Sequence, residues 1–150
     1  MNEQIRYGPG GVDKKNSEGY SDPTAYEALT NIKKEEKVFK PIVYICSPFA
    51  GDVERNTEKA KLYSRFAVFE RNVIAFAPHL LFPLYLFDDD PEERELAMFM
   101  NMVLLGKCNE LWVFGGNITN GMEREISKAK KRRMTIRYFT EDMEEVETCN

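Results

Sequence analysis

Glu125 is the residue of this sequence with the clearest potential for chemistry. It follows a turn-like segment, residues 115–120, and lies near the start of a predicted helix over residues 121–133. A carboxylate at the mouth of a site can act as a nucleophile or a base. Acidic residues near a helix start also interact favourably with the helix dipole, so a structural role stays open for Glu125 and is the simpler interpretation of Glu123.

The residues just before Glu125 suit an anionic ligand. Thr119, Asn120, Gly121 and Met122 combine a hydroxyl, an amide and a glycine at the start of the same helix. Such a helix start can form a cradle for phosphate or carboxylate. We therefore expect these four residues to bind part of a ligand.

A second candidate loop contains Ser47, Pro48, Phe49 and Gly51. It follows a short apolar run, where small residues allow backbone N–H groups to face an anion at a helix start. The loop matches neither the dinucleotide fingerprint nor the Walker loop, so an ordinary strand–helix turn stays open. Tyr44, in the preceding run, is either a core aromatic residue or part of the site.

From residue 41 onward, apolar runs alternate with amphipathic stretches. The pattern predicts strands over residues 42–46, 73–77, 110–114 and 134–139, helices over 53–70, 92–107 and 121–133, and one or two helical turns over 141–146. The helix over 53–70 should bury Ala60, Tyr63, Ala67 and Val68. Strands alternating with helices predict a doubly wound α/β fold, Rossmann-like or flavodoxin-like, with a parallel sheet of four to five strands flanked by helices.

In such sheets ligands bind beyond the carboxyl ends of the strands, where the strand order reverses. This rule selects three loops, residues 47–52, 78–83 and 115–121. His79 follows the second strand and could point into the site or be a structural histidine.

Residues 1–40 differ in composition from the rest. They contain a Gly-Pro-Gly-Gly segment, a short helical pattern over residues 25–32 and few large apolar side chains. Such a segment cannot form a core, which predicts an N-terminal arm that is flexible or packs on something else. Residues 41–150 are then one domain.

Composition excludes several functional classes. The net charge of −4 argues against broad nucleic-acid binding, and the chain shows neither an apolar run of about 20 residues nor a signal peptide. The odd set Cys46, Cys108 and Cys149 is typical of free thiols in a reducing compartment, which predicts a cytoplasmic protein. The single histidine has no cysteine at a ligand spacing, so we expect no metal site. We also expect no cofactor.

Four segments carry a family resemblance: residues 44–52, 77–83, 108–115 and 121–129. Because of the order and spacing of these segments, the chain from residue 41 to 139 resembles the nucleoside 2-deoxyribosyltransferase superfamily, and more closely its small phage and bacterial relatives of unassigned activity. The resemblance implies a small nucleoside or nucleotide ligand and a homodimer or larger homo-oligomer, whose neighbouring subunits complete each other's sites.

The resemblance also implies roles for individual residues. Glu125 matches the nucleophile, and Tyr44 matches the tyrosine that positions it. The Ser47–Pro48 loop matches the backbone segment that holds the ligand. Thr119 stands where nucleoside transferases carry aspartate and the nucleotide-hydrolase branch carries a serine that contacts a 5′-phosphate. A hydroxyl can donate to phosphate while an aspartate would repel it, so Thr119 favours a nucleotide.

Two departures from the family oppose catalysis. Asn101 replaces an aspartate thought to handle the proton of the departing base, and an amide cannot be a general acid. Ala50 stands where the nucleotide-hydrolase branch has an arginine that reaches the phosphate. The remaining candidates for the acid are His79 and the carboxylates of residues 88–95.

The leading functional prediction is an N-glycosidic-bond hydrolase or deoxyribosyltransferase that acts on a (deoxy)nucleoside 5′-phosphate or a related nucleotide. The alternative is a weakly catalytic or non-catalytic protein that binds or sequesters a nucleotide-derived signal. Asn101 and Ala50 favour this alternative.

Overall fold

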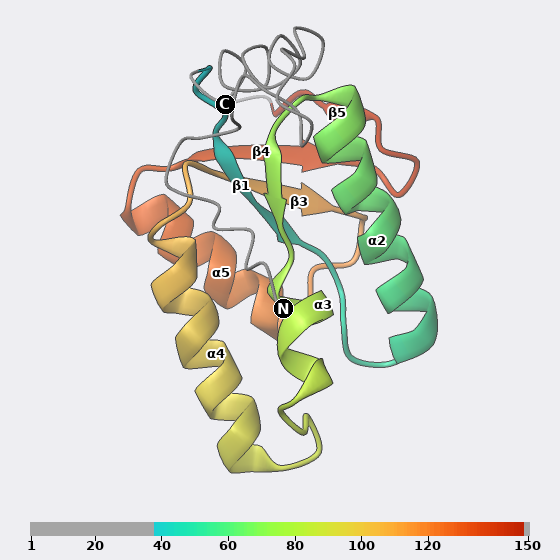
Figure 1. Ribbon diagram of the computed structural model, residues 1–150, viewed down its shortest axis with the longest axis vertical. Helices are drawn as coiled ribbons and strands as arrows, with labels where there is room; N and C mark the ends of the chain where they lie inside the picture. The colour runs from blue at the N-terminus through green and yellow to red at the C-terminus, as the bar shows by residue number, and fades with distance from the viewer. Residues whose placement is uncertain (1–37, 149–150) are drawn as a thin grey trace, which may run out of the picture. The chain divides into compact units, whose positions relative to one another are not determined.

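The computed structural model describes residues 38–148 (Figure 1). Its strands are β1 (Ile42–Cys46), β2 (Ile74–Phe76), β3 (Glu110–Phe114), β4 (Thr135–Phe139) and β5 (Glu145–Val146). Its helices are α2 (Val53–Glu70), α3 (Pro78–Leu81), α4 (Pro91–Leu105) and α5 (Asn120–Lys131), with a short 3-10 turn, Phe82–Leu84, after α3. The helix predicted over residues 25–32 lies outside the described residues. Within residues 38–148, no helix has both the length and the apolar character needed to cross a lipid bilayer.

The sheet has the strand order β2-β1-β3-β4-β5. Strands β1 to β4 pair in parallel, and β5 pairs antiparallel with β4. The predicted α/β fold with a sheet of four to five strands is therefore confirmed. Because β1 lies between β2 and β3, the strand order reverses between β1 and β3. The carboxyl ends of these two strands are the expected place for a ligand.

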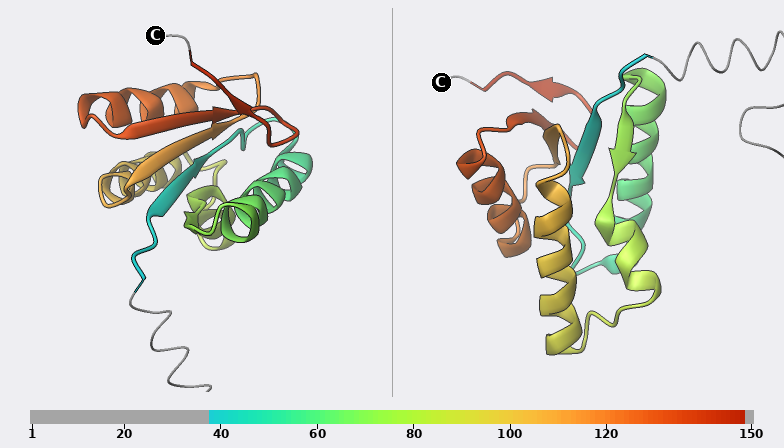
Figure 2. Two further views of the ribbon diagram at one scale, coloured as in Figure 1. Left: turned by 90° about the horizontal axis from the view of Figure 1, so that it is seen from above. Right: turned by 60° about the vertical axis from the view of Figure 1, so that its left-hand side comes forward.

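Helix α2 covers one face of the sheet, and α4 and α5 cover the other (Figure 2, left view). Alternate side chains of a strand point to opposite faces. In β1, Val43 and Ile45 accordingly pack on the α2 side, while Tyr44 and Cys46 pack on the side of α4 and α5. Tyr44 and Cys46, which are two residues apart on β1, thus both face α4 and α5.

The prediction of helical turns over residues 141–146 is wrong. The chain turns at residues 141–142 and then forms β5, which pairs with β4 at Phe139 and Tyr138. The Glu145 carboxylate binds Arg71 at 3.2 Å and Arg137 at 3.1 Å. These partners lie far from Glu145 along the chain or on the neighbouring strand, so the local helical pattern carried no sign of them.

Two further details differ from the predictions. The segment after β2 is helical rather than a loop, because α3 and the 3-10 turn occupy residues 78–84, with Pro78 at a position that a helix start accepts. In α2, Ala60, Tyr63 and Ala67 are buried as predicted, but Val68 is 42% exposed. One residue advances a helix by about 100°, which turns Val68 away from the face that contains Ala67.

Candidate active site

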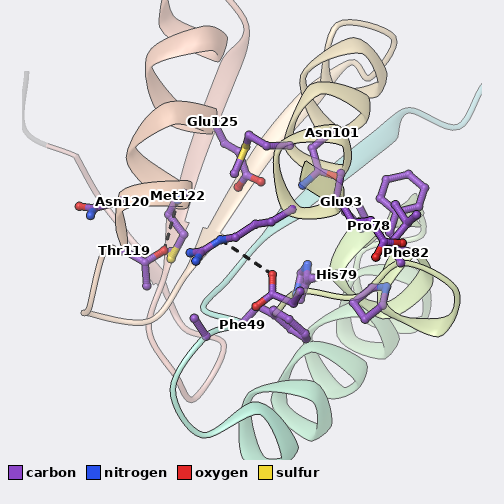
Figure 3. Close-up of a pocket in the computed structure, with 18 of the residues that line it drawn as sticks. Phe49, Pro78, His79, Phe82, Glu93, Asn101, Thr119, Asn120, Met122 and Glu125 are labelled. Atoms are coloured by element: carbon purple, nitrogen blue, oxygen red, sulfur yellow. Dashed lines mark hydrogen bonds and ion pairs between the residues drawn. The ribbon is translucent and has the colours of Figure 1, made fainter. Parts of the chain in front are cut away.

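A cavity of about 300 Å³ lies beyond the carboxyl ends of β1, β2 and β3, and is called the main cavity here (Figure 3). Segments that follow all three strands contribute to it, together with α4. Most residues predicted for the site line this cavity: Ser47, Phe49, His79, Asn101, Thr119, Asn120, Gly121, Met122 and Glu125.

Three predicted residues do not line the main cavity. Tyr44 lies behind Glu125 in the core, and Pro48 lines a neighbouring cavity. Gly51 has a φ of +97°, a backbone conformation that residues other than glycine rarely adopt. A backbone requirement of the turn before α2 therefore accounts for this glycine.

Two side chains of β1 hold the Glu125 carboxylate. The Tyr44 hydroxyl donates to Oε1 at 2.7 Å, and the Cys46 thiol donates to Oε2 at 3.1 Å. Glu125 is 8% exposed, and both donors are fully or almost fully buried. The two donors are two residues apart on one strand, so the pleat directs both toward the same carboxylate.

The electrostatics of Tyr44, Cys46 and Glu125 keep the two donors neutral beside the Glu125 carboxyl group. Burial raises the pKa of Glu125, while the hydrogen bonds from Cys46 and Tyr44 oppose that rise. Burial and the neighbouring Glu125 also raise the pKa of both Tyr44 and Cys46, so these two groups stay protonated. The arrangement can hold an ionised carboxylate in one orientation at the wall of the cavity.

Ser47 and His79 form a second hydrogen-bonded pair in the main cavity, with 2.8 Å between Oγ and Nε2. Burial lowers the pKa of His79 to about 4. The imidazole is therefore neutral near neutral pH, which makes it a poor general acid and a weak base for Ser47. The pair is better suited to orienting a ligand than to proton transfer.

Residues just before α4 and in its first turn bring further charges to the main cavity. Asp88, Glu93 and Arg94 all line it, and Arg94 Nε lies 3.9 Å from Asp88 Oδ1. Of the acidic residues in the predicted 88–95 segment, Asp88 and Glu93 line the cavity, so their carboxyl groups are the candidates for protonating a leaving group. Asn101 contributes an amide whose Oδ1 is buried without a hydrogen-bond partner among the described residues.

Thr119 caps α5, because its Oγ1 accepts a hydrogen bond from Met122 N at 3.3 Å. The hydroxyl hydrogen remains available to a ligand. A Cβ on Gly121 would lie 3.3 Å from Met98 Cε and 3.9 Å from Thr119 Oγ1. Glycine at this position therefore leaves room beside Thr119.

Cys46 and Arg94 were not predicted as site residues, and Asp88 and Glu93 were predicted only as part of the 88–95 segment. The period of two along β1 could have placed Cys46 on the same face as Tyr44. No local pattern indicates that α4 turns Glu93 and Arg94 toward the cavity. Among the described residues, no three His, Cys, Asp or Glu side chains are grouped so that they could hold a metal ion.

Comparisons with known proteins place the chain in a family and a fold. A solved 2-deoxyribosyltransferase from the psychrotolerant bacterium Bacillus psychrosaccharolyticus superposes with a TM-score of 0.52 at 15% identity, over 73% of this chain and 77% of that chain. That likeness shows a shared fold. A search of curated proteins found no match. The profile of one family matches residues 41–139, so the chain belongs to the family described as a domain of unknown function (DUF7768).

Proposed function

We propose that this protein cleaves the N-glycosidic bond of a (deoxy)nucleoside 5′-phosphate or a related nucleotide, with Glu125 as the nucleophile. The observation that carries the proposal is the Glu125 carboxylate, buried at a cavity wall and held through both oxygens by Tyr44 and Cys46. The likeness in fold to a 2-deoxyribosyltransferase supports this class of chemistry.

The proposed reaction has two steps. A Glu125 oxygen bonds to the anomeric carbon while the carbon–nitrogen bond breaks, and the base leaves with the bonding electrons and receives a proton. Glu93 or Asp88 supplies that proton, since both line the cavity and Asn101 cannot donate one as an acid. Water or a second base then attacks the anomeric carbon, gives up a proton to the Glu93 or Asp88 carboxylate that donated one in the first step, and releases Glu125 with net retention of configuration.

Thr119 is proposed to bind the 5′-phosphate. Its oxygen is engaged by Met122 N, but its hydrogen can donate to an anion at the positive end of the α5 dipole. Thr119→Val should weaken nucleotide binding by on the order of 1.5–3 kcal/mol, about ten- to hundredfold. Thr119→Asp should weaken it further by charge repulsion. Calorimetric titration of both variants with a nucleotide and its nucleoside measures these effects.

Turnover of purified protein tests the proposal directly. The four deoxynucleoside 5′-monophosphates and their nucleosides are incubated separately, with and without a second free base, and released base or new nucleotide is measured by chromatography. We expect base release or exchange from a nucleotide and none from Glu125→Gln. Unchanged release by Glu125→Gln would contradict the assigned nucleophile.

A second candidate function is binding without turnover. It is favoured by Asn101 at the position of the expected acid and by a neutral His79. In that case the nucleotides raise the melting temperature of the protein, because they bind only the folded state, but no base is released.

We also propose that the protein is a homodimer or larger homo-oligomer. Helix α4 exposes Leu96, Phe99 and Val103 at 48%, 66% and 47%, with the spacing of a single helix face. A second copy would bury this stripe beside the main cavity, to which α4 also contributes. Light scattering should show an oligomer at micromolar concentration, and Phe99→Glu should reduce it to a monomer. A wild-type monomer would contradict this proposal.

A further inference from the structure

A second cavity of about 290 Å³ adjoins the main cavity and is called the side cavity here. Ser47, Ala50 and Thr119 line both cavities, so the two meet at the loops that follow β1 and β3. Most of the other residues that line the side cavity have polar or charged side chains: Asp52, Arg55, Asn56, Lys59, Tyr63, Asn117 and Glu141. A ligand group held at Thr119 therefore has the side cavity next to it.

The acidic groups of the side cavity are already engaged. The Asp52 carboxylate accepts a hydrogen bond from Arg55 N at 3.2 Å and caps α2. The Glu141 carboxylate pairs with Lys59 Nζ at 3.0 Å. The Arg55 guanidinium, by contrast, makes no ion pair or side-chain hydrogen bond with any residue in the described range.

Tyr63 provides a second available donor. It is 2% exposed and its ring stacks on Phe114 at 4.4 Å, yet its hydroxyl has no hydrogen-bond partner within residues 38–148. Burial raises the pKa of Tyr63, with Glu141 and Asp142 adding to the rise and Arg55 opposing it, so the hydroxyl stays protonated. Tyr63 lines the side cavity, where its hydroxyl can donate to an acceptor on a ligand.

The main cavity is less favourable for a phosphate. Its charged lining consists of the carboxylates Asp88, Glu93 and Glu125 against one guanidinium, Arg94, which lies 3.9 Å from Asp88. A phosphate dianion among three carboxylates is repelled, whereas a neutral base and sugar are not. The charges therefore favour a phosphate on the side-cavity side of Thr119.

We propose that the side cavity is the phosphate subsite of a nucleotide whose base and sugar occupy the main cavity. The phosphate oxygens accept from Thr119 at the border, from the Arg55 guanidinium and from the Tyr63 hydroxyl. The planar guanidinium can donate two parallel hydrogen bonds to one phosphate. This inference rests on the proposed function. It assigns the cationic side chain for the phosphate to Arg55 on α2, because the loop after β1 has Ala50 where the nucleotide-hydrolase branch has an arginine.

Calorimetric titration of charge-neutral variants tests the subsite. The probes are the four deoxynucleoside 5′-monophosphates, their nucleosides and inorganic phosphate. Arg55→Gln should weaken binding of the preferred nucleotide by about tenfold or more and leave nucleoside affinity unchanged. Arg65→Gln is the matched control, since Arg65 lies on the same helix, stacks over Phe69 and lines neither cavity. Arg94→Gln tests the main cavity.

The outcomes separate the inference from the proposed function. Nucleotide preference that survives Arg55→Gln but is lost in Arg94→Gln overturns the subsite and leaves the nucleotide as substrate. A wild type that binds nucleoside and nucleotide equally overturns nucleotide recognition. If inorganic phosphate nevertheless raises the melting temperature of the wild type and not of Arg55→Gln, the subsite stands without the proposed substrate. No phosphate effect in that case overturns both.

Discussion

The two faces of the sheet bury different kinds of side chain. Toward α2, Phe114 stacks between Tyr63 at 4.4 Å and Phe139 at 4.8 Å, in a cluster that is almost entirely apolar. Toward α4 and α5, the buried cluster includes Tyr44 and Cys46 and adjoins the carboxylate of Glu125. Strand β1 supplies side chains to both faces, so a single strand contributes to the stable core and to the proposed chemistry.

This difference shows how the domain can tolerate a buried acid. Removing a carboxylate from water is unfavourable unless hydrogen bonds compensate. Tyr44 and Cys46 provide that compensation, but burial still raises the pKa of Glu125, so desolvation outweighs the two donors. The aromatic face has no such penalty. We therefore expect substitution of Phe114 to affect mainly stability, and substitutions of Glu125 and its two donors to affect mainly activity.

Glu125→Gln should have the largest effect on activity. Loss of the proposed nucleophile should lower the rate about 10³-fold or more. The folded chain holds the Glu125 proton to higher pH than the unfolded chain, so ionisation of Glu125 lowers the stability as the pH rises through that interval. Glutamine does not ionise, and the variant should keep or raise the melting temperature at neutral pH. Rate assays measure the activity and thermal melts measure the melting temperature. A strongly destabilised Glu125→Gln variant would contradict the idea that Glu125 serves activity and not stability.

Phe114→Ala should have the largest effect on stability. The side chain is fully buried between two aromatic rings, and its removal should lower the free energy of unfolding by about 3–5 kcal/mol. Activity per folded molecule should change little. Urea unfolding measures the stability, with Phe69→Ala as control, because Phe69 is 69% exposed on the same side of the domain. Equal losses in the two variants would show that the aromatic face is not a packed core.

Cys46→Ala should have the smallest effect of the three. It removes one donor to Glu125, which should lower the catalytic efficiency about five- to tenfold. Because this hydrogen bond lowers the pKa of Glu125, its loss should move the acid limb of the pH–rate profile to higher pH.

Two variants control for the Cys46 prediction. Cys46→Ser keeps a donor and should restore most of the rate and the original acid limb. Cys108→Ala removes a thiol that donates to Leu104 O instead, at 3.4 Å, and should leave the profile unchanged. An acid limb that moves equally in Cys46→Ala and Cys46→Ser would show that packing, not hydrogen bonding, explains the effect.

Much of the fold could be predicted because its signals are local. Apolar runs and helix caps, such as Asp90 before Pro91, depend on neighbouring residues, and the predicted elements correspond to β1 to β4, α2, α4 and α5. Strand β5 could not be predicted in this way. It has two residues, both exposed, and its formation depends on pairing with β4 and on arginines elsewhere in the chain.

The alternation of strands and helices was enough to predict which loops meet at the edge of the sheet, because parallel strands bring their carboxyl ends together. Which side chains touch there depends on the tertiary packing. Tyr44 and Cys46 lie 81 and 79 residues from Glu125, and their contacts depend on how α5 packs against β1. The side cavity likewise combines α2, the loop after β3 and Glu141. Such contacts follow from the packing of distant segments, which no local periodicity encodes.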